Sequence, residues 1–199
     1  MFNNLKISTR LVGAFTVLLA LILLIGALSA TRAIAVRDQL VDITERRMKI
    51  IAELELIRDE GNFQARALRN MALMTDPAQV AQEKQAIEKS KAEVIRRVAE
   101  LDKIIVSAEG RTLQQATADA RQPFRDGQEK FMALLAGGQR EEAIRFLLES
   151  LRPLQLAYFK AIDNAVTFQS KGGDEAGAQA KTAVANLVTT IIAAVLLAA

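Results

Sequence analysis

The hydrophobic positions of this chain form two uninterrupted apolar stretches on either side of a long polar region. The first stretch, residues 11–30, contains 20 residues without a charge. As a helix it would rise about 30 Å, which matches the hydrocarbon core of a bilayer. The second stretch, residues 182–199, contains 18 uncharged residues and has no polar flank at its end. We therefore predict two transmembrane helices, the second of them truncated.

A cleaved signal peptide is the alternative interpretation of the first stretch. Lys6 and Arg10 form a basic leader, and Leu28-Ser29-Ala30 offers small residues for cleavage. However, the apolar region of a signal peptide is only about 7–15 residues long. The longer run here, followed by a second apolar stretch, favours an uncleaved anchor.

The charges around the first stretch predict its orientation. Residues 1–10 contain two basic residues and no acidic one, so we expect this tail to stay in the cytoplasm. Residues 31–181 then lie outside, and we expect a sensor domain in the periplasm of a bacterium, anchored in the inner membrane by two spans. The absence of cysteine is compatible with this compartment but does not establish it.

The polar segment has the spacing of long helices. It shows no period-2 alternation typical of strands, and the chain contains only three prolines. The apolar positions of its first helix alternate by fours and threes, with one polar break at Gln64. We expect this row to face a core, and it comprises Ile50, Leu54, Ile57, Gly61, Gln64, Leu68 and Met71.

Turn residues divide the segment into helices. Asp76 and Pro77 are typical of a helix start, and Gly110 and the pair Gly137-Gly138 mark further ends. We predict helices that run to about residue 75, over 78–107, over 111–136, over a short 139–149, and from about 150 into the second span. The fold class expected is all-α: an up-down-up-down antiparallel four-helix bundle flanked by two transmembrane helices. Gly172, Gly173 and Gly177 should soften the last helix outside the membrane.

Composition narrows the class of function. The chain contains no His, Cys or Trp, so it lacks an imidazole base, a thiol nucleophile and soft-metal ligands. Adjacent acidic pairs such as Glu141-Glu142 diverge on a helix and do not converge on a metal. All 23 acidic residues and all but two of the 26 basic ones lie in residues 31–181, which leaves no basic field for nucleic acid. We expect no enzyme, cofactor, metal or nucleic-acid partner.

Several short strings resemble a known family. They are Leu5-Lys6-Ile7-Ser8-Thr9-Arg10-Leu11, Ile57-Arg58, Leu68-Arg69-Asn70-Met71-Ala72-Leu73-Met74-Thr75-Asp76, Gly138-Gln139-Arg140-Glu141-Glu142-Ala143 and Leu151-Arg152-Pro153-Leu154. In this order and spacing the chain resembles the transmembrane and four-helix-bundle sensor part of methyl-accepting chemotaxis proteins. The resemblance implies a periplasmic domain that dimerises, binds a small attractant or repellent, and signals through its last helix. It also implies a cytoplasmic part, absent here, that would act on a kinase complex.

The resemblance and the residue types together suggest a carboxylate site. The pattern resembles that of aspartate-sensing members of the family, in which arginines of the first helix and a threonine of the last helix surround a carboxylate ligand. Guanidinium groups bind carboxylates with two parallel hydrogen bonds. We expect a small organic acid or amino acid as ligand, although helix arginines are often simply solvated. The candidate ligand-binding residues are Arg58, Arg66, Arg69, Gln155, Tyr158 and Thr167.

A second apolar row on the first helix predicts a homodimer interface, with a wider core as the alternative. It comprises Leu56, Phe63, Ala67 and Met74.

The sequence leaves other functions open. The same kind of sensor precedes histidine kinases and diguanylate cyclases. A membrane-anchored helical scaffold that senses nothing would share the same pattern, and a periplasmic binding protein could deliver the signal indirectly.

Overall fold

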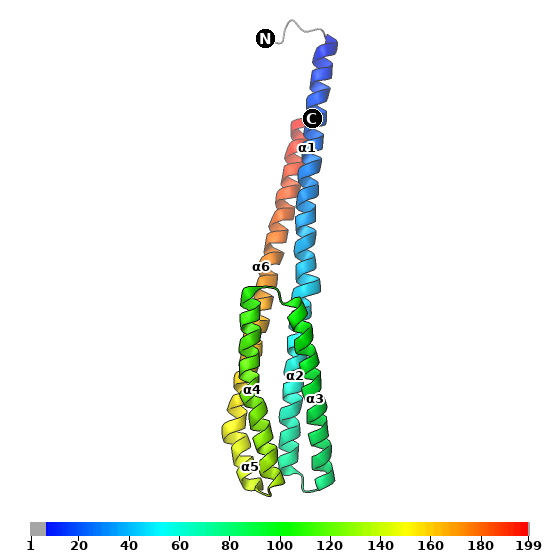
Figure 1. Ribbon diagram of the computed structural model, residues 1–199. Coiled ribbons are helices and arrows are strands. Elements are labelled where there is room, and N and C mark those ends of the chain that lie inside the picture. The colour runs from blue at the N-terminus through cyan, green and yellow to red at the C-terminus, as the bar shows by residue number, and fades with distance from the viewer. Residues whose placement is uncertain (1–6, 199) are drawn as a thin grey trace. The chain divides into compact units, whose positions relative to one another are not determined.

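The computed structural model describes residues 7–198, which are almost entirely helical (Figure 1). Residues 1–6 of the predicted cytoplasmic tail lie outside the described residues. The described helices are α1 (Ile7–Val41), η1 (Asp42–Arg47), α2 (Met48–Leu73), α3 (Pro77–Ile104), α4 (Ala108–Ala136), α5 (Arg140–Phe146), η2 (Leu147–Leu151) and α6 (Arg152–Ala198). The two η segments are π-helical turns.

The described chain separates into two compact units. One contains the residues up to Thr44 together with those from Gly173 onward, and the other contains Glu45 to Gly172. In the first unit both apolar stretches are helical and mostly exposed. Each is long and apolar enough to cross a membrane, although no membrane is present in the structure. The side chain of Gln39 donates a hydrogen bond of 3.3 Å to Gln179 Oε1 within this unit.

The second unit is a bundle of α2, α3, α4 and the first part of α6, with α5 and η2 at the end opposite the α3–α4 turn (Figure 1). The core row predicted on the first helix is confirmed, because all seven of its residues are buried in α2. Gln64, the one polar member, is buried as deeply as its apolar neighbours and is hydrogen-bonded within the core.

The other helices contribute the remaining core. Their largest fully buried side chains are Ile87, Val94 and Leu101 on α3, Phe124 and Phe131 on α4, and Leu151 and Ile162 from η2 and α6. Burying one such side chain stabilises a fold by roughly 1.5–3 kcal/mol. These residues therefore hold the four helices together, and they match the apolar spacing in the sequence.

Local caps fix where the helices end. The Asp76 carboxylate accepts a hydrogen bond of 2.9 Å from the backbone N–H of Ala78, and Pro77 occupies the first position of α3, as predicted. Arg140 Nη1 donates to the Ala72 carbonyl at 2.6 Å and so satisfies one of the last carbonyl groups of α2. Gly138, with φ of 75°, adopts the left-handed conformation that ends α4.

The predicted return at Gly110 is wrong by a few residues. The chain turns at residues 105–107, and the Ser107 hydroxyl caps α4 by accepting from the Gly110 N–H at 3.1 Å. Gly110 is instead buried in the first turn of α4, where an added Cβ would lie 3.0 Å from Ile105 Cγ2. The glycine therefore serves close packing rather than the turn.

The predicted break between a short helix and the last helix is also wrong. Residues 140–198 form one continuous helical run, and the π-helical turn η2 ends two residues before Pro153. Proline has no N–H to donate, and its ring crowds the preceding turn of an α-helix. The wider π-helical turn accommodates the proline without ending the helix.

Candidate functional site

Arg58 is engaged by carboxylates of its own bundle. Its guanidinium forms an ion pair with Asp163 on α6 and another, at 3.1 Å, with Glu55 one turn earlier on α2. The Arg58 and Asp163 side chains are 30% and 42% exposed, so the pair lies at the edge of the bundle. Since these carboxylates already neutralise the guanidinium, Arg58 is poorly placed to bind a ligand.

Arg69 and Gln155 do lie together. They line a cavity of about 330 Å³ between α2, α4, η2 and α6, which we call the α2–α6 cavity. Asn62 and Arg152 add further polar groups to it. Arg69 Nε donates to the Ala65 carbonyl at 3.1 Å, which leaves the two terminal nitrogens of the guanidinium for other partners.

The other predicted ligand-binding residues lie elsewhere. Arg66 and Thr167 are exposed, and neither lines the α2–α6 cavity. Tyr158 is buried and contributes to a different and larger cavity. The structure therefore does not bring the six predicted residues together at one site.

The predicted dimer row is divided as well. Leu56 is 40% exposed, and Phe63 and Met74 are partly exposed. Ala67 is only 1% exposed and belongs to the core of its own bundle. Within this row, Ala67 therefore has no surface left to offer a partner chain, because its small side chain is covered by neighbouring helices.

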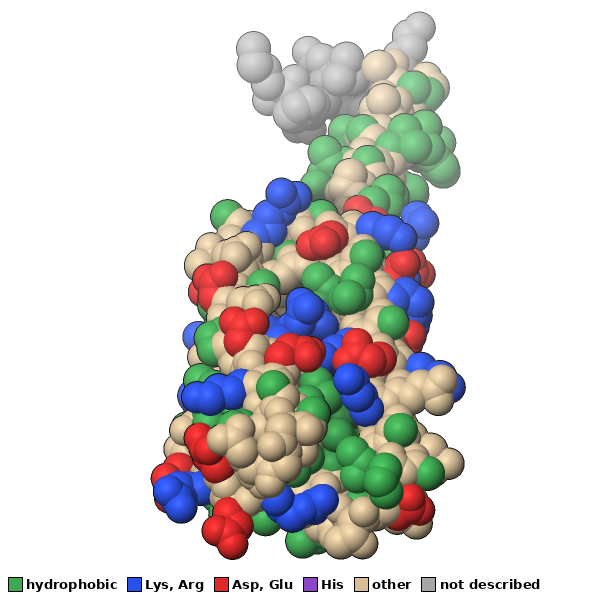
Figure 2. Space-filling model, turned by 60° about the horizontal axis from the view of Figure 1, so that its bottom comes forward, with side chains coloured by type: hydrophobic (Ala, Val, Ile, Leu, Met, Phe, Trp, Pro, Cys, Tyr) green, Lys and Arg blue, Asp and Glu red, His purple; other side chains and the backbone are tan. Residues whose placement is uncertain are grey.

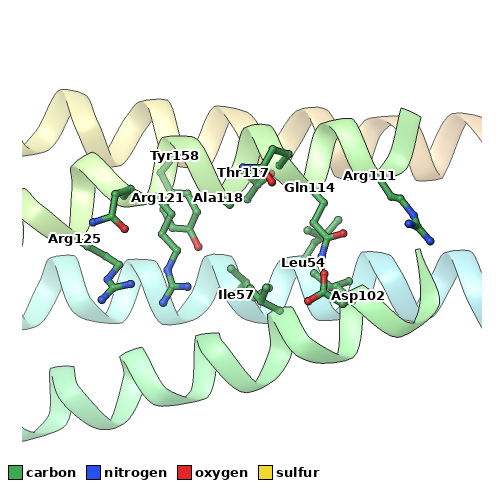
Figure 3. A pocket seen from close by; sticks show the side chains of 14 residues that line it. Leu54, Ile57, Asp102, Arg111, Gln114, Thr117, Ala118, Arg121, Arg125 and Tyr158 are labelled. Carbon is green, nitrogen blue, oxygen red and sulfur yellow. Dashed lines mark hydrogen bonds between the residues drawn. The ribbon is translucent and has the colours of Figure 1, made fainter. Parts of the chain in front are cut away.

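The larger cavity, of about 490 Å³, opens between α3 and α4 (Figure 3). We call it the α3–α4 cavity. α3 packs more closely against α2 than against α4, and the cavity lies between α3 and α4. Leu54 and Ile57 of α2 and Tyr158 of α6 form its apolar floor, and Val98 and Leu101 of α3 form one wall.

Three arginines of α4 line the opposite wall of the α3–α4 cavity: Arg111, Arg121 and Arg125. Figure 3 shows the Arg121 and Arg125 guanidinium groups projecting from α4 toward α2 and α3. Within residues 7–198 no carboxylate lies within ion-pair distance of Arg121 or Arg125. The wall therefore presents two positive charges without a counter-ion from the bundle.

Burial at this cavity shifts the pKa values of two of its lining residues, Arg121 and Tyr158. Burial lowers the pKa of Arg121, and the neighbouring positive charge of Arg125 lowers it further. Burial also raises the pKa of the Tyr158 hydroxyl to about 12, an effect that Arg121 partly opposes. Tyr158 thus keeps its proton at neutral pH and is available as a hydrogen-bond donor.

The remaining polar groups of the cavity are partly committed to each other. The Asp102 carboxylate accepts a hydrogen bond of 2.7 Å from Gln114 Nε2, near the α3–α4 turn. The Thr117 hydroxyl donates to the Leu113 carbonyl at 2.9 Å. Both groups therefore have a hydrogen-bond partner within the bundle, although Asp102 keeps its negative charge, whereas Arg121 and Arg125 have no carboxylate partner among the described residues.

The α4 arginines were missed because sequence reasoning treated charged helix positions as solvated. A signal for them exists: Arg111, Gln114, Ala118, Arg121 and Arg125 follow each other at spacings of three, four, three and four. This is the spacing of a stripe that faces a neighbouring helix. A basic stripe with that spacing could have been read as the wall of a polar cavity.

The surface offers no single-sign field on the face visible in Figure 2. Basic and acidic side chains alternate over the described part of this face, with hydrophobic side chains between them. Likewise, residues 7–198 contain no group of three or more acidic residues close enough to hold a metal ion. The cavities are therefore the chemically distinctive features of the described bundle.

Comparison with known proteins places the chain in a family. A family model described as a four-helix-bundle sensory module for signal transduction matches residues 4–184. A search of curated proteins finds no match. The matched region contains the whole bundle and the first apolar stretch and ends three residues into the second, and the helical architecture agrees with it. The chain therefore belongs to the four-helix-bundle sensory modules of methyl-accepting chemotaxis proteins.

Proposed function

We propose that the chain is the sensor part of a transmembrane chemoreceptor that detects a small ligand outside the inner membrane. The observation that carries this proposal is the family match over residues 4–184, which contains the first apolar stretch and the whole bundle and ends three residues into the second apolar stretch. The two apolar helices support a membrane anchor at each end of the bundle sequence.

The helix connectivity supports a route for the signal. Tyr158 at the α3–α4 cavity and Gln155 at the α2–α6 cavity both belong to α6, which continues to Ala198 without interruption. A ligand that binds two states of the bundle unequally can therefore bias one continuous helix. Coupling energies of this kind are roughly 1–3 kcal/mol.

A carboxylate-bearing ligand is favoured by the charge of the cavities. Both are lined by at least two arginines, and arginine binds carboxylates with charge-assisted, often paired hydrogen bonds. We accordingly expect an organic acid or an amino acid.

Dimerisation is part of the proposal. Leu56 on α2, Leu148 on η2 and Leu156 on α6 are 40%, 56% and 56% exposed. Exposed leucines are common singly, but Leu148 and Leu156 both line the α2–α6 cavity, and this grouping together with Leu56 on α2 supports contact with a second copy. Because the chain has no cysteine, Leu56→Cys introduces a unique reporter. We expect disulfide-linked dimers of Leu56→Cys in membranes and none from Lys89→Cys, an exposed control on α3. Equal crosslinking of the two would argue against this face.

Topology is tested by labelling single cysteines in intact cells. Gln139→Cys lies in the exposed turn after α4, and Asn4→Cys lies in the N-terminal tail. We expect a membrane-impermeant maleimide to label the first from outside and the second only after the membrane is opened. Labelling in the reverse order would refute an outward-facing sensor.

Sensing is tested by joining the chain, through its second span, to the cytoplasmic part of a characterised chemoreceptor. A panel of amino acids and organic acids should include at least one that changes kinase output. A chimera that assembles in the membrane but answers no ligand in the panel, and binds none by calorimetry, would favour the scaffold alternative.

A further inference from the structure

We propose that the α3–α4 cavity is a binding site for a small organic carboxylate with an apolar ring, whose carboxylate is held by Arg121 and Arg125. The inference rests on the proposed sensory function and names a site and a ligand class for it. It places the ligand inside one bundle, among α2, α3, α4 and α6, rather than at the α2–α6 cavity that contains Arg69.

The first argument is the unmatched charge. Arg121 and Arg125 are one helical turn apart, so their side chains lie on the same face of α4 and repel each other. Elsewhere the bundle pairs its inward-facing cations: Arg97 with Glu53 at 3.0 Å, and Lys91 with Glu88 at 2.9 Å. The one acidic residue that lines the cavity, Asp102, accepts a hydrogen bond from Gln114 and forms no ion pair with Arg121 or Arg125. A ligand anion would supply the missing counter-charge.

The second argument is the partial desolvation of this charge. Arg121 is only partly exposed, and burial is the main reason why its pKa is lowered. A guanidinium withdrawn from water interacts with an anion more strongly than one on an open surface, because fewer water molecules screen the pair. In addition, each of the two guanidinium groups presents several N–H donors in one plane, which suits paired hydrogen bonds to a planar carboxylate.

The third argument is the shape and character of the floor. Leu54, Ile57, Leu101 and Tyr158 line the cavity but are each at most 3% exposed, so they close its inner end and present only their edges to it. A cavity of about 490 Å³ is larger than a bare carboxylate requires and lies within the usual range for small-molecule sites. A ligand with an apolar ring would fill this volume against the largely apolar lining, whereas acetate or inorganic phosphate would leave most of the volume to water.

The Tyr158 hydroxyl adds a directional group. Figure 3 shows the hydroxyl beside Arg121, facing the cavity. Since its pKa is raised by burial, it remains a donor at any physiological pH. It can thus donate to the second carboxylate oxygen or to a ring substituent.

The test uses the full chain in lipid nanodiscs and isothermal titration calorimetry. Benzoate and cyclohexanecarboxylate are the probes, with benzyl alcohol as the uncharged analogue and acetate as the analogue without a ring. The variants are Arg121→Gln, Arg125→Gln and their combination. Arg69→Gln in the α2–α6 cavity is the matched control, because it makes the same change outside the proposed site. Circular dichroism melts check that each variant is folded.

A second variant blocks the cavity without changing its charge. Ala118 is exposed and lines the cavity between the arginines and Gln114, so Ala118→Trp should fill it. We expect both ring carboxylates to bind the unchanged chain and Arg69→Gln saturably. Each single arginine variant should weaken binding roughly tenfold or more, and the double variant and Ala118→Trp should abolish it. Acetate and benzyl alcohol should bind at least about tenfold more weakly than the ring carboxylates.

Three results would overturn the site. These are no saturable binding of either ring carboxylate, unchanged binding by the double variant, or equal loss of binding in Arg69→Gln. If another ligand then binds in an Arg69-dependent way, the sensory function stands and only this site is wrong. If the ring carboxylates bind here but the chimeric receptor responds neither to them nor to any other ligand of the panel, the site stands and the sensory function is the proposal that fails.

Discussion

The side-chain amide of Gln128 on α4 donates a hydrogen bond of 2.9 Å to Gln64 Oε1 on α2, in the middle of the bundle core. Gln64 in turn donates to the Ser90 hydroxyl on α3 at 2.9 Å. Three helices are therefore joined by one buried polar chain. In the described structure Gln128 Oε1 is buried without a hydrogen-bond partner, so one acceptor of this buried hydrogen-bond network is unsatisfied.

We predict that replacing one glutamine of this network lowers the stability of the fold more than replacing both. Gln64→Leu removes one partner and leaves the Gln128 amide buried without an acceptor, which costs about 1–3 kcal/mol. Replacing both with Gln64→Leu and Gln128→Leu removes the polar groups together, and the stability should return close to that of the unchanged chain. Chemical unfolding in detergent, followed by circular dichroism, measures both. A double variant less stable than either single variant would contradict the prediction.

The Arg58–Asp163 pair predicts a small structural effect and no effect on ligand affinity. Both side chains are partly exposed, so solvent screens the pair and its contribution should be about 1 kcal/mol or less. A double-mutant cycle with Arg58→Ala and Asp163→Ala measures the coupling energy by chemical unfolding. Calorimetry of Arg58→Ala with any ligand found should give unchanged affinity, and a tenfold loss would restore Arg58 to the binding site.

The sole tyrosine predicts a loss of stability in strongly alkaline solution. The pKa of Tyr158 rises from 10.0 to about 12 on folding, because burial disfavours the charged phenolate. Between these values the unfolded chain releases the proton before the folded one does. The stabilisation is thus fully present below about pH 10 and is lost as the pH rises through about 12, up to about 2–3 kcal/mol in all.

The control for this prediction is Tyr158→Phe, which keeps the ring and removes the ionisable hydroxyl. The difference between the unfolding free energies of the two proteins, followed over pH, reports Tyr158 alone. Because the chain contains one Tyr and no Trp, tyrosinate absorbance gives the pKa directly. A midpoint near 10 in the folded chain would show that the hydroxyl is not desolvated.

The helical architecture was predictable because local rules act strongly here. The row from Ile50 to Met71 repeats by fours and threes, and only one face of a helix can satisfy that spacing in a core. Asp76-Pro77 and Gly137-Gly138 are backbone signals that act within one turn, and both helix boundaries lie where they indicate. These features depend on neighbours in sequence, so the sequence alone specifies them.

The site was less predictable because it depends on distances between helices. Arg58 and Arg69 are equivalent as helix arginines, yet Asp163 on α6 neutralises one and not the other. Arg121 and Arg125 line a cavity whose size depends on how far apart α3 and α4 lie. Sequence spacing gives the face of a helix but not the width of the gap beside it.

Gly172 and Gly177 lie in the part of α6 between the bundle and the second apolar stretch, and we predict that the helix unfolds locally most readily there. Gly177 has no atom within 4 Å of the position its Cβ would occupy, so Gly177→Ala should stabilise the helix locally by about 1 kcal/mol. At Gly172 an added Cβ would collide with the Arg47 guanidinium, which also donates to Gln169 at 3.4 Å. Gly172→Ala should therefore stabilise the helix less, because Arg47 must move.

Hydrogen exchange of residues 170–182 measures both variants. We expect clearly slower exchange in Gly177→Ala and a smaller change in Gly172→Ala. In the chimeric receptor, a weaker ligand response in Gly177→Ala would assign these glycines to signalling, whereas slower exchange with an unchanged response would make the segment a passive connection.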